Sequence, residues 1–220
     1  MASPKIKEDI MKRILPDLWQ TAVENPAPGL YTHAYLLTRE TGNVLFYNTG
    51  HHQDIEDMAD LGGVAYQFLS HQDELGESLN VIRQRFGAQL GGHIHEQSEF
   101  ARIRVPDILF ERREVQLDNI DVIPTPGHTP GSTCFYVHSA HGRYLFTGDT
   151  LTLTKEGTWA AGYIPGYSDR EQLAESLKLL QELAPDAVIC SGFDGGNAYQ
   201  TIVPASWPSL VHRAFEKLVR

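Results

Sequence analysis

The chain has 220 residues, 41% of them hydrophobic and 21% charged, and a formal net charge of −10 at pH 7. This length and composition predict one soluble globular domain with a sizeable core, and the acidic balance argues against a nucleic-acid partner, whose phosphates would repel it. No apolar run is long enough for a signal peptide or a membrane span, so we expect no membrane partner.

The first half of the chain alternates strand and helix signals. Residues 1–16 are charged and predict a short helix or a loose arm at the start of a single domain over residues 1–220. Strand-like runs follow at residues 18–23, 31–38, 44–47 and 64–69. Apolar residues then recur at helical spacing, which predicts an amphipathic helix with Asp73 and Glu74 in its first turn. The apolar positions of this helix are Leu75, Leu79, Ile82 and Phe86.

The second half continues the alternation. Strands are predicted at residues 108–110, 114–117, 121–125, 133–138, 143–146 and 186–190. Residues 151–167 are rich in glycine, threonine and aromatic residues and predict a long loop beside a site. Ser168 and Glu171 form a capping box before a helix, and another helix closes the chain. Cys134 and Cys190 lie in apolar strands, which favours buried, reduced thiols and a cytoplasmic location.

Two turns carry the most informative residues. The segment Thr125-Pro-Gly-His-Thr-Pro-Gly-Ser132 places a histidine after a strand, and Thr147-Gly-Asp-Thr150 places an aspartate after another. A Pro-Gly-His turn keeps the imidazole out of any strand ladder, so the ring can point into a cleft. Imidazole nitrogen and carboxylate oxygen are both donors that zinc accepts. His128 and Asp149 are therefore candidate metal ligands.

Together the two motifs resemble the metallo-β-lactamase superfamily, a group of mostly metal-dependent hydrolases, from about Leu18 to the end of the chain. The resemblance implies an α+β fold: a four-layer αβ/βα sandwich of two mixed β-sheets flanked by helices. It places a metal cleft along one edge of the sheets. It also implies that His128 binds one metal and that Asp149 bridges two.

The family's first metal motif, Thr-His-x-His-x-Asp-His-x-Gly, is altered in this chain. Residues 68–76 read Phe-Leu-Ser-His-Gln-Asp-Glu-Leu-Gly. With the final glycines aligned, Leu69 replaces the first histidine and Glu74 replaces the third, whereas His71 and Asp73 match the family. With the strand ends aligned instead, two residues are missing. Either way, one histidine and one aspartate remain.

Two further positions depart from the family pattern. Phe193 stands where the family has the histidine of a Gly-His-Gly turn, and Asn48 replaces the aspartate of an Ile-Asp-Thr-Gly turn. Phenylalanine supplies no donor, so these changes favour one metal rather than two.

We expect His71, His128 and Asp149 to hold one metal, with zinc as the first choice and iron or manganese suited to the same donors. Asp73 or Glu74 would orient the water and take its proton. The substrate would be a small-molecule ester, thioester, amide or phosphoester. The alternative is a metal-free, non-catalytic binding or regulatory protein that keeps the fold. The chain has no Gly-x-Gly-x-x-Gly dinucleotide motif.

Other histidines are weaker candidates. His51 and His52 follow a glycine in a loop expected near the cleft and could supply an imidazole or a base. His93 and His95 alternate as on one strand face, but the family resemblance indicates that this position does not bind metal.

Overall fold

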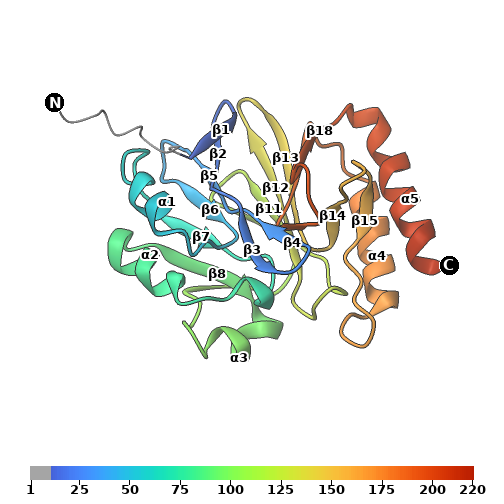
Figure 1. The fold of residues 1–220 in the computed structure, drawn as a ribbon, viewed down its shortest axis with the longest axis horizontal. Helices are drawn as coiled ribbons and strands as arrows, with labels where there is room; N and C mark the ends of the chain where they lie inside the picture. The colour runs from blue at the N-terminus through green and yellow to red at the C-terminus, as the bar shows by residue number, and fades with distance from the viewer. Residues whose placement is uncertain (1–10) are drawn as a thin grey trace.

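Two large β-sheets pack face to face, with helices on their outer sides, over residues 11–220 of a computed structural model (Figure 1). This arrangement confirms the four-layer αβ/βα sandwich that the motifs predicted. Residues 1–10 of the predicted N-terminal arm lie outside the described residues. The rest of that arm contributes the first strand, which pairs with its neighbour instead of standing free.

The first large sheet has seven strands in the order β1-β2-β5-β6-β7-β8-β9. Its strands are β1 (Lys12–Leu15), β2 (Leu18–Gln20), β5 (Tyr35–Leu37), β6 (Val44–Phe46), β7 (Tyr66–Phe68), β8 (Gln89–His93) and β9 (Ile108–Phe110). Pairing is antiparallel from β1 to β6 and parallel from β6 to β9. Parallel neighbours need crossover connections, and these contain the helices α1 (His52–Asp57), α2 (Ser78–Phe86) and α3 (Gln97–Phe100).

The second large sheet has six strands in the order β10-β11-β12-β13-β16-β18. Its strands are β10 (Glu114–Gln116), β11 (Ile120–Pro124), β12 (Thr133–Ser139), β13 (Gly142–Gly148), β16 (Ala187–Cys190) and β18 (Tyr199–Thr201). Only β13 and β16 are parallel, and the helix α4 (Arg170–Gln181) lies in the crossover between them. The closing helix α5 (Trp207–Val219) packs on α4 (Figure 1).

A third, smaller sheet corrects one prediction. It has the order β15-β14-β17-β4-β3, with β3 (Glu24–Ala27), β4 (Leu30–Thr32), β14 (Leu151–Leu153), β15 (Trp159–Ala161) and β17 (Gly192–Phe193). Residues 151–167 were predicted as one loop, yet β14 and β15 form a hairpin within them. Three-residue strands are too short to show a recognisable alternation in the sequence. Of the predicted loop, residues 154–158, which connect the two strands, and residues 162–167 have no helix or strand.

Aromatic side chains join the two large sheets. Phe46 on β6 stacks on Phe146 of β13 with ring centroids 3.9 Å apart, and Phe68 on β7 lies 5.7 Å from Phe135 on β12. All four rings are fully buried. Because each pair spans the sheets, these contacts fix the relative position of the loops that leave them at the cleft edge.

Two helix starts differ from the sequence prediction. The amphipathic helix α2 begins at Ser78, so Asp73 and Glu74 belong to a separate 3₁₀ turn, Gln72–Glu74. Helix α4 is capped by Asp169, whose side chain accepts a hydrogen bond from the Gln172 N–H, and not by Ser168. Within the described residues, no helix combines the length and the apolar character needed to cross a membrane.

Candidate metal centre

His128 lies in the turn between β11 and β12, held by the backbone around it. Gly127 has φ 137° and an ideal Cβ there would come within 2.3 Å of the Leu173 nitrogen, so only glycine fits. The His128 Nδ1 lies 2.6 Å from the Gly162 carbonyl oxygen. Since a carbonyl only accepts, Nδ1 carries the proton and Nε2 is left as a free donor of electron pairs. That Nε2 is buried and has no hydrogen-bond partner.

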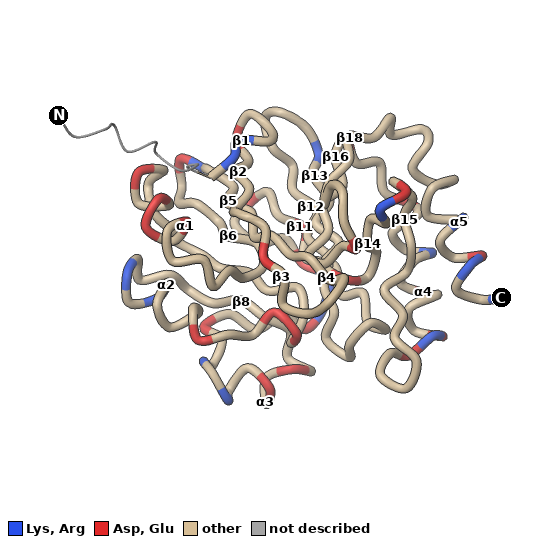
Figure 2. The backbone as a smooth tube through the Cα atoms, viewed as in Figure 1, with Lys and Arg blue, Asp and Glu red and all other residues tan. Residues whose placement is uncertain are grey.

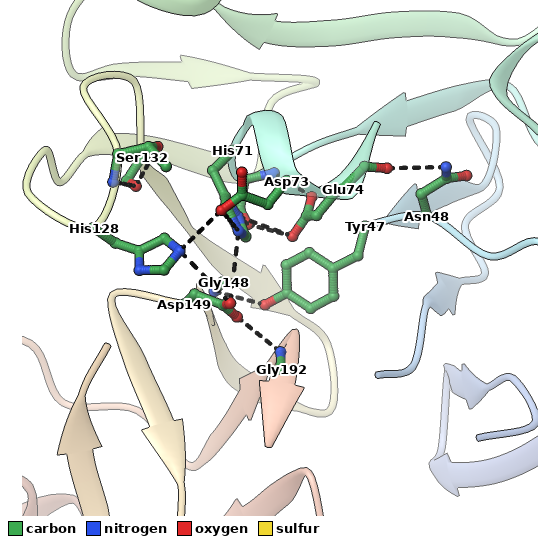
Figure 3. A network of polar contacts seen from close by, with 12 residues as sticks. Tyr47, Asn48, His71, Asp73, Glu74, His128, Ser132, Gly148, Asp149 and Gly192 are labelled. Carbon is green, nitrogen blue, oxygen red and sulfur yellow. Dashed lines mark hydrogen bonds and ion pairs between the residues drawn. The ribbon is translucent and has the colours of Figure 1, made fainter. Parts of the chain in front are cut away.

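His71 follows β7, and its Nε2, like that of His128, faces Asp73 and Asp149. Its Nδ1 lies 2.9 Å from the Ser70 Oγ and 3.3 Å from the Glu74 Oε1. Its ring meets that of His128 edge to face at 4.8 Å between centroids (Figure 3). Burial alone would lower the pKa of His71, but the carboxylates of Glu74, Asp149 and Asp73 outweigh it and raise that pKa to about 10. The surroundings of this imidazole therefore favour a positive charge.

Two carboxylates complete the centre, and each is fixed by one oxygen. Asp149, just after β13, accepts a hydrogen bond from the Gly192 N–H at 2.8 Å on Oδ1. Asp73 accepts one from the Tyr167 hydroxyl at 2.6 Å on its own Oδ1. Both Oδ2 atoms consequently face the two imidazoles (Figure 3). Burial alone would raise the pKa of Asp73, but the nearby imidazole of His128 and the hydrogen bond from Tyr167 outweigh it and lower that pKa.

The spacing of these donors suits a single small cation. The Oδ2 of Asp149 lies 3.6 Å from the His71 Nε2 and 3.7 Å from the His128 Nε2. The Oδ2 of Asp73 lies 3.8 Å and 3.4 Å from the same two nitrogens. Ligands of a tetrahedral zinc, each about 2.0–2.2 Å from the ion, are separated by roughly 3.3–3.6 Å. The unpartnered His128 nitrogen and the donor chemistry therefore fit a zinc-like ion.

Asp73 enters the donor set more strongly than the sequence indicated. Ligand atoms of His71, Asp73 and His128 all lie within 4.8 Å of one another, whereas the sequence assigned the metal carboxylate to Asp149 and a catalytic role to Asp73. Both aspartates face the centre at similar distances from the imidazoles. The family motif led to Asp149, and only the 3₁₀ turn, which no periodicity revealed, brings Asp73 to the same point.

The sequence predicted that Glu74 could orient the water at the centre, but its carboxylate does not face the centre. Its carboxylate accepts hydrogen bonds from the Ser70 N–H at 2.8 Å and the Ser70 Oγ–H at 2.5 Å. It thus lies on the Nδ1 side of His71, away from the Nε2 that faces the aspartates (Figure 3). Asn48 donates to the Glu74 carbonyl oxygen at 3.0 Å and helps to hold this turn. Glu74 therefore positions His71 and is too remote to take a proton at the centre.

The residues that replace family ligands point elsewhere. Phe193 stacks on His33 with centroids 5.3 Å apart and lines a second cavity of about 760 Å³. Its ring does not occupy the space between the imidazoles of His71 and His128, which contact each other directly. Leu69 is buried in a small apolar cluster with Leu79.

The remaining candidate histidines lie outside the donor set. His93 accepts a hydrogen bond from the His95 N–H at 3.2 Å, and burial holds the pKa of His93 down, to about 4. His51 pairs with Asp54 at 3.1 Å. His52 lies on the wall of the cleft that contains His71 and Asp149. This cleft has a volume of about 740 Å³.

The comparisons with known proteins agree with this architecture. The model of the family described as the metallo-beta-lactamase superfamily matches residues 49–192. The chain belongs to the metallo-beta-lactamase superfamily. A metallo-beta-lactamase from Pontibacter korlensis has a similar structure, with a TM-score of 0.73 and 18% identity over 96% of this chain and 98% of that one. One from Cronobacter sakazakii, a motif mutant, gives 0.70 and 18% identity over 96% and 97%. At this identity the two structures establish the fold.

Curated relatives are matched over shorter segments. A hydroxyacylglutathione hydrolase of Hydrogenovibrio crunogenus is 32% identical over 123 residues, which is 54% of this chain and 42% of that protein. A probable hydroxyacylglutathione hydrolase of Schizosaccharomyces pombe is 32% identical over 72 residues, or 28% of each chain. The chain thus spans less than half the length of these relatives.

Proposed function

We propose that the protein is a mononuclear, metal-dependent hydrolase that cleaves an ester or thioester of a small molecule. The observation that carries this proposal is the convergence of two buried imidazole nitrogens on one carboxylate oxygen: the Asp149 Oδ2 lies 3.6 Å from the His71 Nε2 and 3.7 Å from the His128 Nε2. The proposed ligands are His71, His128 and Asp149, and the proposed ion is zinc. Iron and manganese accept the same donors, and metal analysis separates the three.

Asp149 is the better ligand and Asp73 the better base because their surroundings differ. The Asp149 side chain is 18% exposed and is tethered to a backbone N–H, whereas the Asp73 side chain is 43% exposed on a short turn. A less exposed carboxylate held by a backbone N–H suits a permanent ligand, and an accessible carboxylate suits proton exchange with solvent.

The chemistry divides between the metal and the chain. When bound, a divalent ion supplies Lewis acidity and lowers the pKa of water toward about 7. Asp73 would hold the attacking water through Oδ2 and accept its proton, while the Tyr167 hydroxyl keeps Oδ1 in place. Hydrolysis consumes one water, breaks the acyl C–O or C–S bond, and releases the carboxylic acid with the alcohol or thiol. The names of the relatives favour these bonds over amides and phosphoesters.

A single metal is favoured by three substitutions at family ligand positions. Leu69 and Phe193 supply no donor, and Glu74 is committed to Ser70 and to His71 Nδ1. A second ion would therefore lack most of its ligands. We also propose a cytoplasmic location, which the free, buried cysteines Cys134 and Cys190 support.

The test is metal content with two matched single variants. Purified protein should contain about one zinc, iron or manganese per chain and should hydrolyse neutral ester and thioester probes. Asp149→Asn should lose both the metal and the activity. Asp73→Asn should keep the metal and lose about a hundredfold or more in kcat, because general base catalysis contributes about 10²–10⁴-fold.

The double variant His128→Ala with Asp149→Ala, checked for folding by circular dichroism, gives the baseline for metal-free protein. Wild-type protein that takes up no metal after incubation with excess zinc would refute the proposal and favour a metal-free binding protein. If Asp73→Asn loses the metal and Asp149→Asn keeps it, the two carboxylates exchange roles.

A further inference from the structure

The cleft beside the metal centre has an unusual distribution of charge. Its walls include five carboxylates, from Glu24, Asp73, Glu74, Glu77 and Asp149. Among the described residues that line it, none is a lysine or an arginine. Residues 69–77, between β7 and α2, likewise include three acidic residues and no lysine or arginine; Figure 2 marks the acidic and basic positions along the backbone.

Part of this negative charge would be neutralised by a bound ion or is buried in hydrogen bonds. A divalent ion at the proposed centre would offset the charges of Asp73 and Asp149, and Glu74 is buried against Ser70. The carboxylates of Glu24 and Glu77 remain at the rim. Glu24 is held by the Gly50 N–H at 3.0 and 3.2 Å to its two oxygens, so its charge has a fixed position. The cleft therefore stays negative after a divalent ion binds.

The cleft is a binding site and not merely an acidic surface. The imidazoles of His71 and His128 are 3–4% exposed, and the unpartnered Nε2 of His128 faces the same centre. Apolar side chains of Leu30, Leu75 and Val81 share the walls with the carboxylates. A substrate should therefore combine an apolar part, an acyl carbonyl at the centre and a group that the carboxylates of Glu24 and Glu77 at the rim do not repel.

We infer that the cleft selects substrates with a cationic group, such as an ammonium on the acyl chain or leaving group, and disfavours substrates with free carboxylates. This inference rests on the proposed hydrolase function. Opposite charges across a cleft raise association rates and like charges lower them, and both effects weaken as salt screens them. A hydroxyacylglutathione is a net anion, so this chain should process it poorly, although relatives are named for that reaction.

The experiment compares three acetate esters that differ in the alcohol part. The alcohol carries a cationic trimethylammonium group in the first, a neutral tert-butyl group of the same shape in the second and an anionic sulfonate group in the third. At about 20 mM salt, we expect kcat/KM to be at least about tenfold higher for the cationic than for the anionic ester. The ratio should shrink to within about threefold at 1 M salt, where the Debye length is about 3 Å. The double variant Glu24→Gln with Glu77→Gln should lower the cationic preference severalfold, and Glu111→Gln, at an exposed residue that does not line the cleft, should leave it unchanged.

Binding gives a readout that does not depend on turnover. In ligand-observed NMR with zinc-loaded protein, a tetraalkylammonium probe should bind and be displaced by salt, and an alkanesulfonate should not bind. Hydrolysis of the neutral ester without a cationic preference would overturn this inference and leave the hydrolase proposal standing. Absence of hydrolysis of all three esters would instead count against the proposed function, and the binding comparison would still decide the charge preference.

Discussion

The two turns that carry the imidazoles of His128 and His71 are built in different ways. The His128 turn is fixed by its backbone: the Gly162 carbonyl oxygen holds Nδ1, and glycine at position 127 allows the close approach to α4. The His71 turn is fixed by side chains, because Ser70 and Glu74 hold Nδ1 there. Both solutions leave Nε2 facing the centre. We therefore expect substitutions in the His128 turn to destabilise the fold, and loss of the Glu74 carboxylate to disturb the His71 ring alone.

The largest expected effect is on folding, from Gly127→Ala. The added Cβ would lie 2.3 Å from the Leu173 nitrogen at φ 137°, so backbone must move, and we expect a loss of about 3 kcal/mol or more in the free energy of unfolding. Gly166→Ala is the matched control, because Gly166 also has positive φ, 78°, but has no atom within 4 Å of its Cβ position. It should cost about 1 kcal/mol. Urea unfolding measures both, and equal losses would contradict the steric explanation.

The His71 turn should respond through metal affinity and not through folding. Removing the partner of a ligating imidazole typically lowers metal affinity by about 10–100-fold, and we expect Glu74→Ala to fall in this range. Competition with a chromogenic zinc chelator measures it, with Glu111→Gln as the control. Unchanged zinc affinity in Glu74→Ala would show that the Ser70 hydroxyl alone holds the ring.

The smallest effect should come from Tyr167→Phe. It removes the hydrogen bond to the Asp73 Oδ1 and leaves the ring beside His128. A net hydrogen bond of about 0.5–1.5 kcal/mol corresponds to about a twofold to tenfold decrease in kcat, with zinc content unchanged. Tyr163→Phe is the control, since the Tyr163 ring lies under Arg170 at 4.6 Å. Loss of zinc in Tyr167→Phe would instead make Asp73 a ligand.

The sequence predicted the backbone-built turn better than the side-chain-built one. Thr-Pro-Gly-His128 and Thr-Gly-Asp149 are local motifs whose geometry follows from their own glycines, so they could be recognised without a structure. The orientation of Glu74 depends on Ser70 and on a 3₁₀ turn, and sequence spacing gives no sign of either. The orientation of the Phe193 ring depends on stacking against His33, which is far away in the chain, so local sequence does not predict it.

The position of the donors between the two large sheets has a consequence for folding kinetics. His71 leaves the first sheet, and His128 and Asp149 leave the second, so neither sheet alone contains the centre. Contacts between residues so distant in sequence form late, because long loops must close first. During refolding, zinc uptake should therefore follow the docking of Phe46 on Phe146. The ion would then act as a clamp on a sandwich that has already closed, stabilising the native state without guiding the chain toward it.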